Sequence, residues 1–363
     1  MIKKKEPDKS TLKIQKGIQQ PPCVNPDVLN GSGRKKRKVY SADEFISGIL
    51  SGNRTILSQA ITLIESSLSD NYETIQLIVE KCLPYSGQSI RIGVTGVPGA
   101  GKSTFIETFG LYLTGEGRKL AVLAIDPTSG KSRGSILGDK TRMEKLSTHP
   151  NAFIRPSPSA GTLGGVAQKT RETIILCEAA GFDTIIVETV GVGQSETAVH
   201  SMVDFFLLLM IAGAGDELQG IKRGIMEMAD VVAINKADGQ NKLAAERTRD
   251  LFQNTLRLFP GSPSGWKPDV LTCSALENNG IRELWEKIMD YVHFTMQNGY
   301  FYEQRKDQAV IRMHDTVLEF LNDSFYNHEE VKSLKPLLEQ QLYEGRITSY
   351  KAALRLIESY RKK

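Results

Sequence analysis

Apolar residues recur at two different spacings along the chain, and these spacings divide it into three stretches. Between residues 40 and 84 they fall three or four positions apart, as on one face of an α-helix, and Ser41 followed by Glu44 is a typical helix start. Between residues 88 and 280 short β-rich runs alternate with helical stretches, which is typical of a parallel sheet covered by helices. From about residue 281 the helical spacing returns and continues to the C-terminus. The pattern predicts an α/β unit between two helical regions.

The α/β stretch contains several candidate strands. Many of them are apolar at consecutive positions, as expected when helices cover both faces of a mostly parallel sheet. The run 206–211 consists of six apolar residues and is expected to be the most buried. The candidates are residues 90–95, 120–126, 153–155, 184–188, 205–212, 231–235 and 270–273.

The C-terminal region carries apolar stripes at helical spacing with few strands to cover them. One stripe consists of Val310, Met313, Val317, Phe320 and Leu321. Such a helical arm needs another surface to bury its apolar face, and either the α/β unit or a second copy of the chain could supply it.

The charge of the chain is unevenly distributed. The 363 residues carry a formal net charge of +4, but residues 1–38 alone hold 11 Lys and Arg against three acidic residues, so the remainder carries −4. Net charge therefore gives no support for a nucleic-acid partner. The leader over 1–39 contains prolines and glycines without an apolar face, and we expect it to be disordered. It lacks the composition of a transit or signal peptide, which favours a cytoplasmic location.

Two further observations exclude other classes of protein. No apolar run approaches the roughly 20 residues that a membrane-spanning helix requires. The four cysteines and five histidines are scattered, without the spacing of a structural zinc site. We therefore expect a reduced protein without a membrane span.

The strongest chemical signal is a complete G-x-x-x-x-G-K-S motif that follows one candidate strand and opens a helix. In such a loop the backbone amides surround phosphates, the lysine reaches the β- and γ-phosphates, and the serine hydroxyl binds Mg²⁺. The predicted nucleotide-binding residues here are Gly96, Val97, Pro98, Gly99, Ala100, Gly101, Lys102, Ser103 and Thr104.

A second motif indicates which base is bound. Asn235, Lys236 and Asp238 form an N-K-x-D motif at the end of a candidate strand, and a carboxylate there can accept two hydrogen bonds from guanine that adenine does not offer. The next strand ends in an S-A-x element, Ser274, Ala275 and Leu276, which is expected to contact the base through its backbone. GTP and GDP are therefore favoured over adenine nucleotides.

Two acidic residues end strands near the expected phosphate site. Glu188 begins an acidic-x-x-Gly sequence, and with Ser103 it is a candidate Mg²⁺ ligand, while the Gly191 amide would contact the γ-phosphate. Asp126 is a second candidate for the metal site, although a turn cap before Pro127 is an equally good interpretation.

The residues that would activate water are less clear. Two residues separate Gly191 from Gln194, so the water is expected to be poorly positioned and turnover to be slow without a partner. Other candidates lie in glycine-containing segments over 129–142 and 213–222. The predicted catalytic residues are Lys102, Asp139, Gln194 and Lys222, with Arg142 as a further candidate cation.

In these motifs the chain resembles the MeaB/ArgK family of P-loop GTPases. The resemblance rests on residues 93–104, 124–129, 134–143, 188–196 and 212–222, and it extends from about Tyr40 to the C-terminus. It implies a helical region over 40–87, a P-loop GTPase domain over 88–295 and a dimerisation arm over 296–363. It further implies a GTP-hydrolysing chaperone that gates adenosylcobalamin loading and protects or reactivates methylmalonyl-CoA mutase or a closely related acyl-CoA mutase.

Two alternatives remain open from the sequence. One is an accessory GTPase for nickel insertion, which would normally carry a His- or Cys-rich metal site. The other is a kinase or ATPase serving amino-acid transport, which would require ATP, and Asp238 disfavours adenine. The sequence does not distinguish which mutase a chaperone of this kind would serve.

Overall fold

The computed structural model describes residues 40–66, 71–126, 143–158, 163–189, 195–212 and 223–361. Residues Ser41–Lys363 form one compact unit. The predicted disordered leader over 1–39 lies outside the described residues.

Within residues 40–66 and 71–89, three α-helices and a short 3-10 helix precede β1, in the stretch where the apolar spacing predicts helices. The Ser41 hydroxyl accepts a hydrogen bond from the Glu44 amide at 3.2 Å, while the Glu44 carboxylate accepts one from the Ser41 amide at 2.9 Å. This reciprocal pair is a capping box, and it fixes the start of the first helix. The elements are α2 (Ala42–Leu50), α3 (Arg54–Glu65), α4 (Tyr72–Cys82) and η2 (Leu83–Tyr85).

The centre of the unit is a seven-stranded sheet in the order β3-β2-β4-β1-β5-β6-β7, and all neighbouring strands are parallel. This confirms the predicted fold class. The strands are β1 (Ile90–Gly96), β2 (Leu120–Asp126), β3 (Ala152–Pro158), β4 (Thr184–Thr189), β5 (Phe205–Ile211), β6 (Val231–Asn235) and β7 (Asp269–Thr272).

The sequence pattern underestimated one strand. β3 pairs with β2 from Ala152 to Pro158, whereas the apolar pattern covers only 153–155. β3 lies at an edge of the sheet, where proline is tolerated because its missing N–H can face away from the ladder. The polar and proline positions at the end of β3 therefore hide a strand that tertiary pairing extends.

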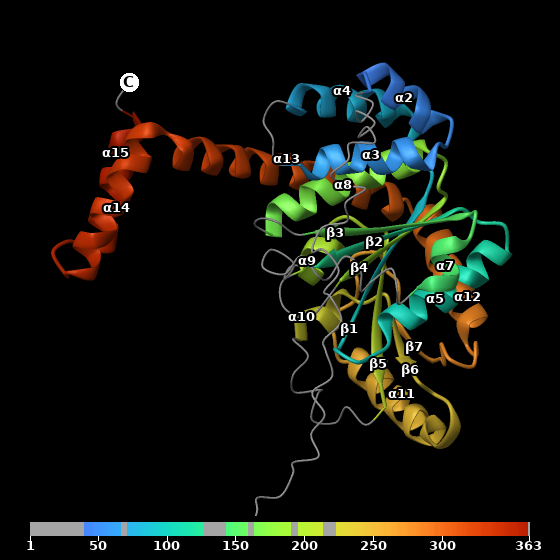
Figure 1. The fold of residues 1–363 in the computed structure, drawn as a ribbon. Coiled ribbons are helices and arrows are strands. Elements are labelled where there is room, and N and C mark those ends of the chain that lie inside the picture. Colours follow the sequence, from blue (N-terminus) through green and yellow to red (C-terminus); the bar gives the residue numbers. More distant parts are fainter. Residues whose placement is uncertain are drawn as a thin grey trace, which may run out of the picture. The chain divides into compact units, whose positions relative to one another are not determined.

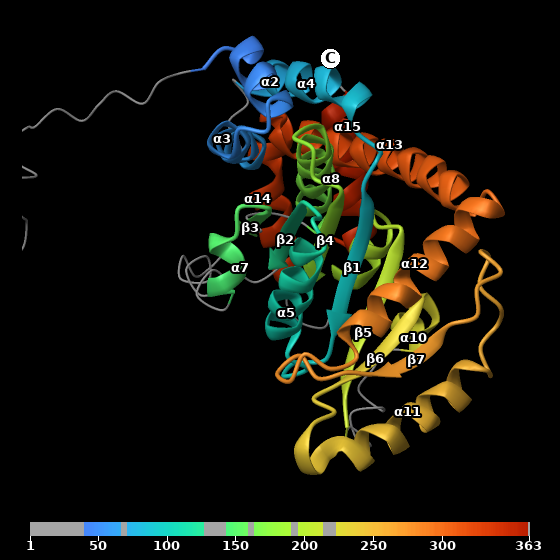
Figure 2. The ribbon, with the colours of Figure 1, turned by 90° about the vertical axis from the view of Figure 1, so that its right-hand side faces the viewer.

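Helices cover both faces of the sheet (Figures 1 and 2). On one face α5 contacts β1 and β2, and α12 contacts α5 and β5; on the other, α8 contacts β2 while α9 contacts β1 and β4. The helices α2, α3 and α4 pack on α8. Between β1 and the C-terminal helices, the described helices are α5 (Lys102–Gly115), α7 (Glu144–Thr148), α8 (Leu163–Ala179), α9 (Ser195–His200), α10 (Arg223–Met228), η4 (Gly239–Asn241), α11 (Lys242–Leu256) and α12 (Ile281–Gln297).

The strand order places a switch point at β1. The chain leaves β1 toward β2 on one side, whereas β4 leads to β5 on the other side of β1. Ligands of open parallel sheets bind where the connections diverge in this way, at the carboxyl ends of the strands. The G-x-x-x-x-G-K-S loop follows β1 and therefore lies at this position.

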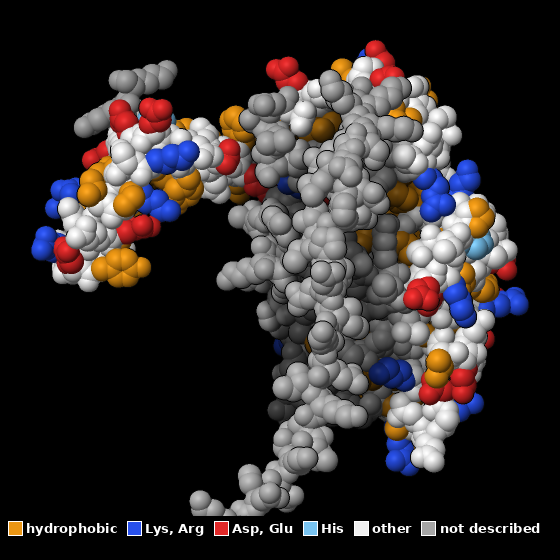
Figure 3. Space-filling model, viewed as in Figure 1, with side chains coloured by type: hydrophobic (Ala, Val, Ile, Leu, Met, Phe, Trp, Pro, Cys, Tyr) orange, Lys and Arg blue, Asp and Glu red, His pale blue; other side chains and the backbone are white. Residues whose placement is uncertain are grey.

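The chain ends in three helices, α13 (Tyr300–Asn327), α14 (Glu329–Tyr343) and α15 (Ser349–Arg361). α13 contacts α8 and α14, and α14 contacts α15. The predicted apolar stripe on α13 is exposed, with Phe320 at 71% and Val317 at 50%, and Figure 3 shows apolar side chains along these helices. None of the described helices is both long and apolar enough to cross a membrane.

Candidate nucleotide site

The loop between β1 and α5 requires glycine at two positions. A Cβ on Gly96, whose φ is +155°, would lie 2.2 Å from the carbonyl oxygen of Leu209 in β5. Gly101 caps α5 with a φ of +84°, a left-handed conformation that side chains rarely adopt. The two glycines let the chain turn from the sheet directly into the helix, so the first amides of α5 are available to an anion.

Lys102, the first residue of α5, places its ammonium group within this loop. Its Nζ donates to the carbonyl oxygen of Gly96 at 2.8 Å and to that of Val97 at 3.4 Å. Burial lowers the pKa of Lys102, while the nearby carboxylates of Glu188 and Glu196 partly oppose this effect. A half-buried cation at a helix N-terminus is suited to binding a phosphate group.

The predicted metal-binding residues Ser103 and Glu188 lie next to each other. The Ser103 hydroxyl donates to the Glu188 carboxylate at 3.3 Å, and β4 places Glu188, which is only 4% exposed, beside β1. Asp126 ends β2, where its neighbour Ile125 pairs with Thr189 of β4. The backbone therefore brings Ser103, Glu188 and Asp126 to the carboxyl end of the sheet. A hydroxyl and a carboxylate are the oxygen ligands that Mg²⁺ prefers, and the site fits this ion.

Asn235 connects the two predicted nucleotide-binding loops. Its Nδ2 donates to the carbonyl oxygen of Ala100 at 2.8 Å, and its Oδ1 accepts from the Ala275 amide at 3.2 Å. The side chain is 2% exposed. The asparagine of the N-K-x-D motif therefore holds the phosphate loop against the S-A-x loop by direct hydrogen bonds.

Ser274, a residue of the S-A-x element, contacts Asp238 of the N-K-x-D motif. The Ser274 hydroxyl donates to the Asp238 carboxylate at 2.5 Å, and the Glu277 amide donates to the same hydroxyl at 3.1 Å. This orients the carboxylate while leaving acceptor positions for a ligand. Lys236 has a φ of +60°, and Leu276 is 82% exposed. The structure thus brings together the predicted residues of 96–104, 235–238 and 274–276.

Some predicted residues cannot be compared with the structure. Asp139, Arg142, Gly191, Gln194 and Lys222 lie outside the described residues. Among the residues that are described, no group of three or more His, Cys, Asp and Glu side chains could hold a metal ion.

The structure adds two residues to which the sequence gives no role. Glu196, in α9, is 1% exposed and acts electrostatically on Lys102. Thr108 donates to the carbonyl oxygen of Ala275 at 2.8 Å and ties α5 to the S-A-x loop. Neither position belongs to a motif with a fixed spacing, so only the tertiary contacts identify them.

Comparison with known proteins agrees with these motifs. Residues 57–330 match the family described as methylmalonyl Co-A mutase-associated GTPase MeaB. A putative GTPase of Caulobacter vibrioides is 49% identical over 312 residues, covering 86% of this chain and 95% of the relative. GTPase ArgK of Escherichia coli is 48% identical and covers 79% and 87%, respectively. The mitochondrial methylmalonic aciduria type A homolog of Mus musculus is 40% identical and covers 96% and 86%.

A solved structure described as LAO/AO transport system kinase has the same fold. It superposes with a TM-score of 0.70 at 37% identity, covering 88% of this chain and 99% of that one. The similarity therefore extends beyond the sheet to most of the described helices.

Proposed function

Because the chain belongs to the family of methylmalonyl-CoA mutase-associated GTPases, we propose that its GTP cycle gates adenosylcobalamin loading of a mutase. The mutase would be methylmalonyl-CoA mutase or a closely related acyl-CoA mutase, which the chain would also protect or reactivate. The observation that carries the nucleotide part of the proposal is the contact of Asn235 with both Ala100 and Ala275, which joins the two predicted nucleotide-binding loops.

The proposed roles follow from the geometry. Lys102 and the first amides of α5 would hold the β- and γ-phosphates, while Ser103 and Glu188 would hold Mg²⁺, with Asp126 as a further ligand in its outer shell. The metal, when bound, would supply charge neutralisation at the phosphates. Glu188 and Glu196 keep a negative field around Lys102 that favours its charged form.

Guanine recognition is proposed for Asp238, which Ser274 holds in place. Replacing Asp238 with asparagine exchanges one acceptor for a donor, and guanine presents only donors to it. We expect Asp238→Asn to weaken GTP binding by about 100-fold, since a charged hydrogen bond is lost and a buried donor is left unmatched. The same variant should bind xanthosine triphosphate better than the wild type does, because xanthine offers an acceptor at the position of the guanine amino group.

The measurement is a competition titration of GTP, xanthosine triphosphate and ATP against a fluorescent guanine nucleotide. Asp250→Asn, an exposed change on α11, is the matched control and should leave all affinities unchanged. If Asp238→Asn retains the wild-type preference for GTP, Asp238 does not read the base.

We further propose that hydrolysis is slow until a partner completes the site. The residues proposed for this step, besides Lys102, are Asp139, Gln194 and Lys222, with Gly191 binding the γ-phosphate. The test is single-turnover GTP hydrolysis by the purified chain, with and without purified methylmalonyl-CoA mutase, combined with a pull-down of the mutase. If the mutase neither binds the chain nor accelerates GTP hydrolysis, it is not the partner. If the chain alone hydrolyses GTP fast, hydrolysis does not depend on a partner.

We assign the GTPase domain to residues 88–295 and the helical arm to residues 296–363. We propose that two chains form a homodimer through this arm. Its support is the exposed apolar stripe on α13, in which Phe320 is 71% exposed. We expect Phe320→Asp to lower the mass in solution from that of a dimer to that of a monomer, measured by light scattering. Leu258→Asp, at a similarly exposed leucine outside the arm, should leave the mass unchanged. A dimer that persists in Phe320→Asp places the interface elsewhere.

The kinase alternative is tested by the same nucleotide titration. The solved relative is described as a transport system kinase, and such an activity in this chain would require ATP binding. A preference for ATP would support the kinase and contradict the GTPase cycle. The described cysteines, Cys82, Cys177 and Cys273, are free and buried, which fits the cytoplasmic location that we propose.

A further inference from the structure

A cavity of about 230 Å³ lies at the amino end of the sheet, at the opposite end of β1 from the nucleotide site. α8 and α13 form two of its walls, and the start of β1 and the turn before β5 form the others. β1 spans seven residues, so the two sites are roughly 20 Å apart. The lining residues are Leu83, Ser86, Gly87, Arg91, Arg171, Ile174, Ile175, Ser201, Met202, Arg305, Gln308, Ala309 and Arg312.

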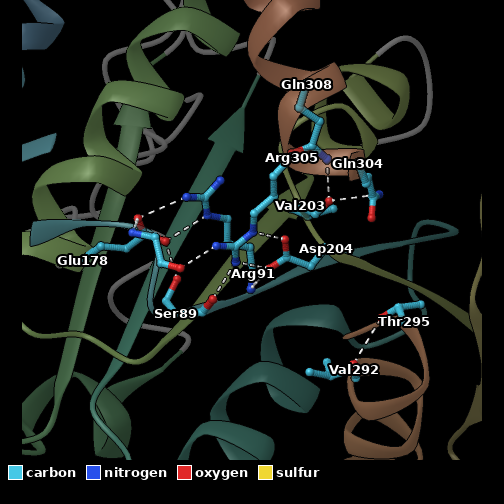
Figure 4. A network of polar contacts seen from close by, with 11 residues as sticks. Ser89, Arg91, Glu178, Val203, Asp204, Val292, Thr295, Gln304, Arg305 and Gln308 are labelled. Atoms are coloured by element: carbon cyan, nitrogen blue, oxygen red, sulfur yellow. Dashed lines mark hydrogen bonds and ion pairs between the residues drawn. The ribbon is translucent and has the colours of Figure 1, made fainter. Parts of the chain in front are cut away.

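Four of the lining residues are arginines, and none is acidic. Each arginine has a carboxylate partner, but these carboxylates all lie outside the lining. Arg91 pairs with Glu178 at 2.9 Å and Arg305 with Asp204 at 2.7 Å, and Figure 4 shows the two guanidinium groups side by side between these carboxylates. Arg312 pairs with Glu172 at 3.2 Å. The carboxylates therefore hold the cations in place, and the only charged residues in the lining of the cavity are arginines.

The first two of these pairs are rigid. Glu178 also accepts from the Ser89 hydroxyl at 2.5 Å and from the Gly87 amide at 2.7 Å. Arg305 donates in addition to the carbonyl oxygens of Gly87 and Ser89, both at 2.6 Å. With the carboxylates only 1% exposed, the arginine side chains are fixed without a ligand and need no reorganisation to bind one.

Arg171 combines a weak carboxylate pair with a buried nitrogen that lacks an acceptor within the described part of the chain. Its side chain is 8% exposed, and its partner Asp315 lies at 3.4 Å with 52% exposure, which makes the pair a weak one. One terminal nitrogen donates to the Ser201 hydroxyl at 2.6 Å. The Nε has no hydrogen-bond partner among the described residues, although it is buried. Burial also lowers the pKa of Arg171 despite the opposing effect of Asp315.

A guanidinium that is mostly buried and poorly paired is costly unless a further acceptor reaches it. From the weak pairing of Arg171 and the arginine-lined wall, we propose that the cavity is a second binding site, and that it takes a small organic oxyanion. The anionic group, a carboxylate or a phosphate, would accept from the terminal nitrogens of Arg171, whose pair with Asp315 is weak, and the neighbouring arginines would supply further charge.

The size and the remaining wall define the rest of the ligand. The volume is below the ~300 to 1,000 Å³ of sites for drug-sized molecules, so the ligand has few non-hydrogen atoms. Ile174, Ile175 and Met202 form an apolar wall beside the arginines, which suits a short hydrocarbon chain. Since α8 and α13 both contribute to the lining, a bound anion would contact the sheet-covering layer and the first helix of the arm at once.

The test is isothermal titration calorimetry of the full chain saturated with GDP and Mg²⁺, so that the nucleotide site is not available to the probes. The probes are butyrate, butyl phosphate, inorganic phosphate and the neutral butyramide. We expect saturable binding of butyrate or butyl phosphate, at least ~10-fold weaker binding of butyramide, and weaker binding of inorganic phosphate than of its butyl ester. Butyrate and butyl phosphate distinguish a carboxylate site from a phosphate site.

Two variants examine the cavity itself. Arg171→Met removes the weakly paired guanidinium, and Ala309→Phe adds a bulky side chain at an exposed position of the cavity lining without changing any charge. Each should weaken the binding of the anionic probe at least ~10-fold. Arg282→Met, at an exposed arginine on α12, is the matched control and should bind as the wild type does.

Three results would overturn the proposal. They are no saturable binding by the wild type, equal binding of butyramide and butyrate, and unchanged binding in both Arg171→Met and Ala309→Phe. If Arg171→Met fails to fold, as circular dichroism would show, Ala309→Phe alone still decides the outcome. Tighter binding of inorganic phosphate than of butyl phosphate would reject the apolar part of the ligand.

Discussion

Replacing Gly96 with alanine tests how closely β1 and β5 approach each other where the loop of the proposed nucleotide site begins. Gly96 pairs with Leu209 of β5, and a Cβ at Gly96 would lie 2.2 Å from the Leu209 carbonyl oxygen and 2.9 Å from the Leu209 Cβ. The nearest of these atoms belongs to the backbone of a buried strand, so a change of side-chain rotamer cannot relieve the clash.

The magnitude follows from this geometry. Carbon and carbonyl oxygen normally approach to about 3.3 Å, so the two strands must separate by roughly 1 Å. Such overpacking costs about 1 to 3 kcal/mol, and an unfavourable φ for alanine adds about 1 to 3 kcal/mol. We therefore expect Gly96→Ala to lower the free energy of unfolding by about 2 to 6 kcal/mol, a large part of the ~5 to 15 kcal/mol that stabilises a typical domain.

The assay is urea denaturation followed by circular dichroism, together with titration of a fluorescent guanine nucleotide in the absence of urea, at a temperature where the variant is folded. Nucleotide affinity should fall at least ~10-fold, because the loop begins at the displaced residue. Gly115→Ala is the control: no atom lies within 4 Å of the added Cβ, and alanine favours the helix, so stability should be unchanged or slightly higher. If Gly96→Ala is as stable as the wild type within about 0.5 kcal/mol, the close approach of β1 and β5 is refuted.

Three further predictions concern other buried polar groups. Burial raises the pKa of Asp230 to about 7, so its protonated form stabilises the fold fully below pH ~4, and this contribution is lost as the pH rises through 7. In urea unfolding, Asp230→Asn should therefore exceed the stability of the wild type by about 2 to 4 kcal/mol at pH 8 and by much less at pH 4. An equal difference at both pH values would contradict this. Burial alone would raise the pKa of Glu178, but Arg91 and the hydrogen bonds that the carboxylate accepts lower this pKa. We therefore expect Glu178→Gln to lower the free energy of unfolding by about 3 to 5 kcal/mol at pH 7, and by less below pH ~4, in the same unfolding assay. Asn235→Ala should weaken guanine nucleotide binding at least ~10-fold in a fluorescence titration, because both loops lose their shared partner; unchanged affinity would exclude this link.

Much of the fold could be predicted because its signals are local. Consecutive apolar residues in 206–211 indicated a strand covered on both faces, and the run forms nearly all of the buried strand β5. The helix start at Ser41 and Glu44 was equally visible, since a capping box depends on residues three positions apart. The end of β3 was missed because only pairing with β2 shows that Pro156 and Ser157 belong to a strand.

The candidate site was also largely predictable, although its connections were not. The motifs at 96–103 and 235–238 have fixed spacings because each is expected to bind one group of the nucleotide, so the sequence alone identifies them as candidates. The contact of Asn235 with Ala100 joins residues 135 positions apart, and that of Thr108 with Ala275 joins residues 167 apart. Spacing along the chain carries no information about such contacts.

By itself, the amino-acid sequence determined the alternation of strands and helices and identified the candidate phosphate-binding loop and the candidate guanine motif, because each depends on residues close together in the chain. The tertiary structure alone decided that β4 lies beside β1, which brings Glu188 to Ser103, and that α13 closes a cavity lined by four arginines against α8. The reason is physical: strand order and helix packing are set by burial of apolar faces between distant segments, and Arg305 meets Gly87 across 218 positions of sequence. Charged residues that are scattered along the chain became a candidate binding site only through that packing.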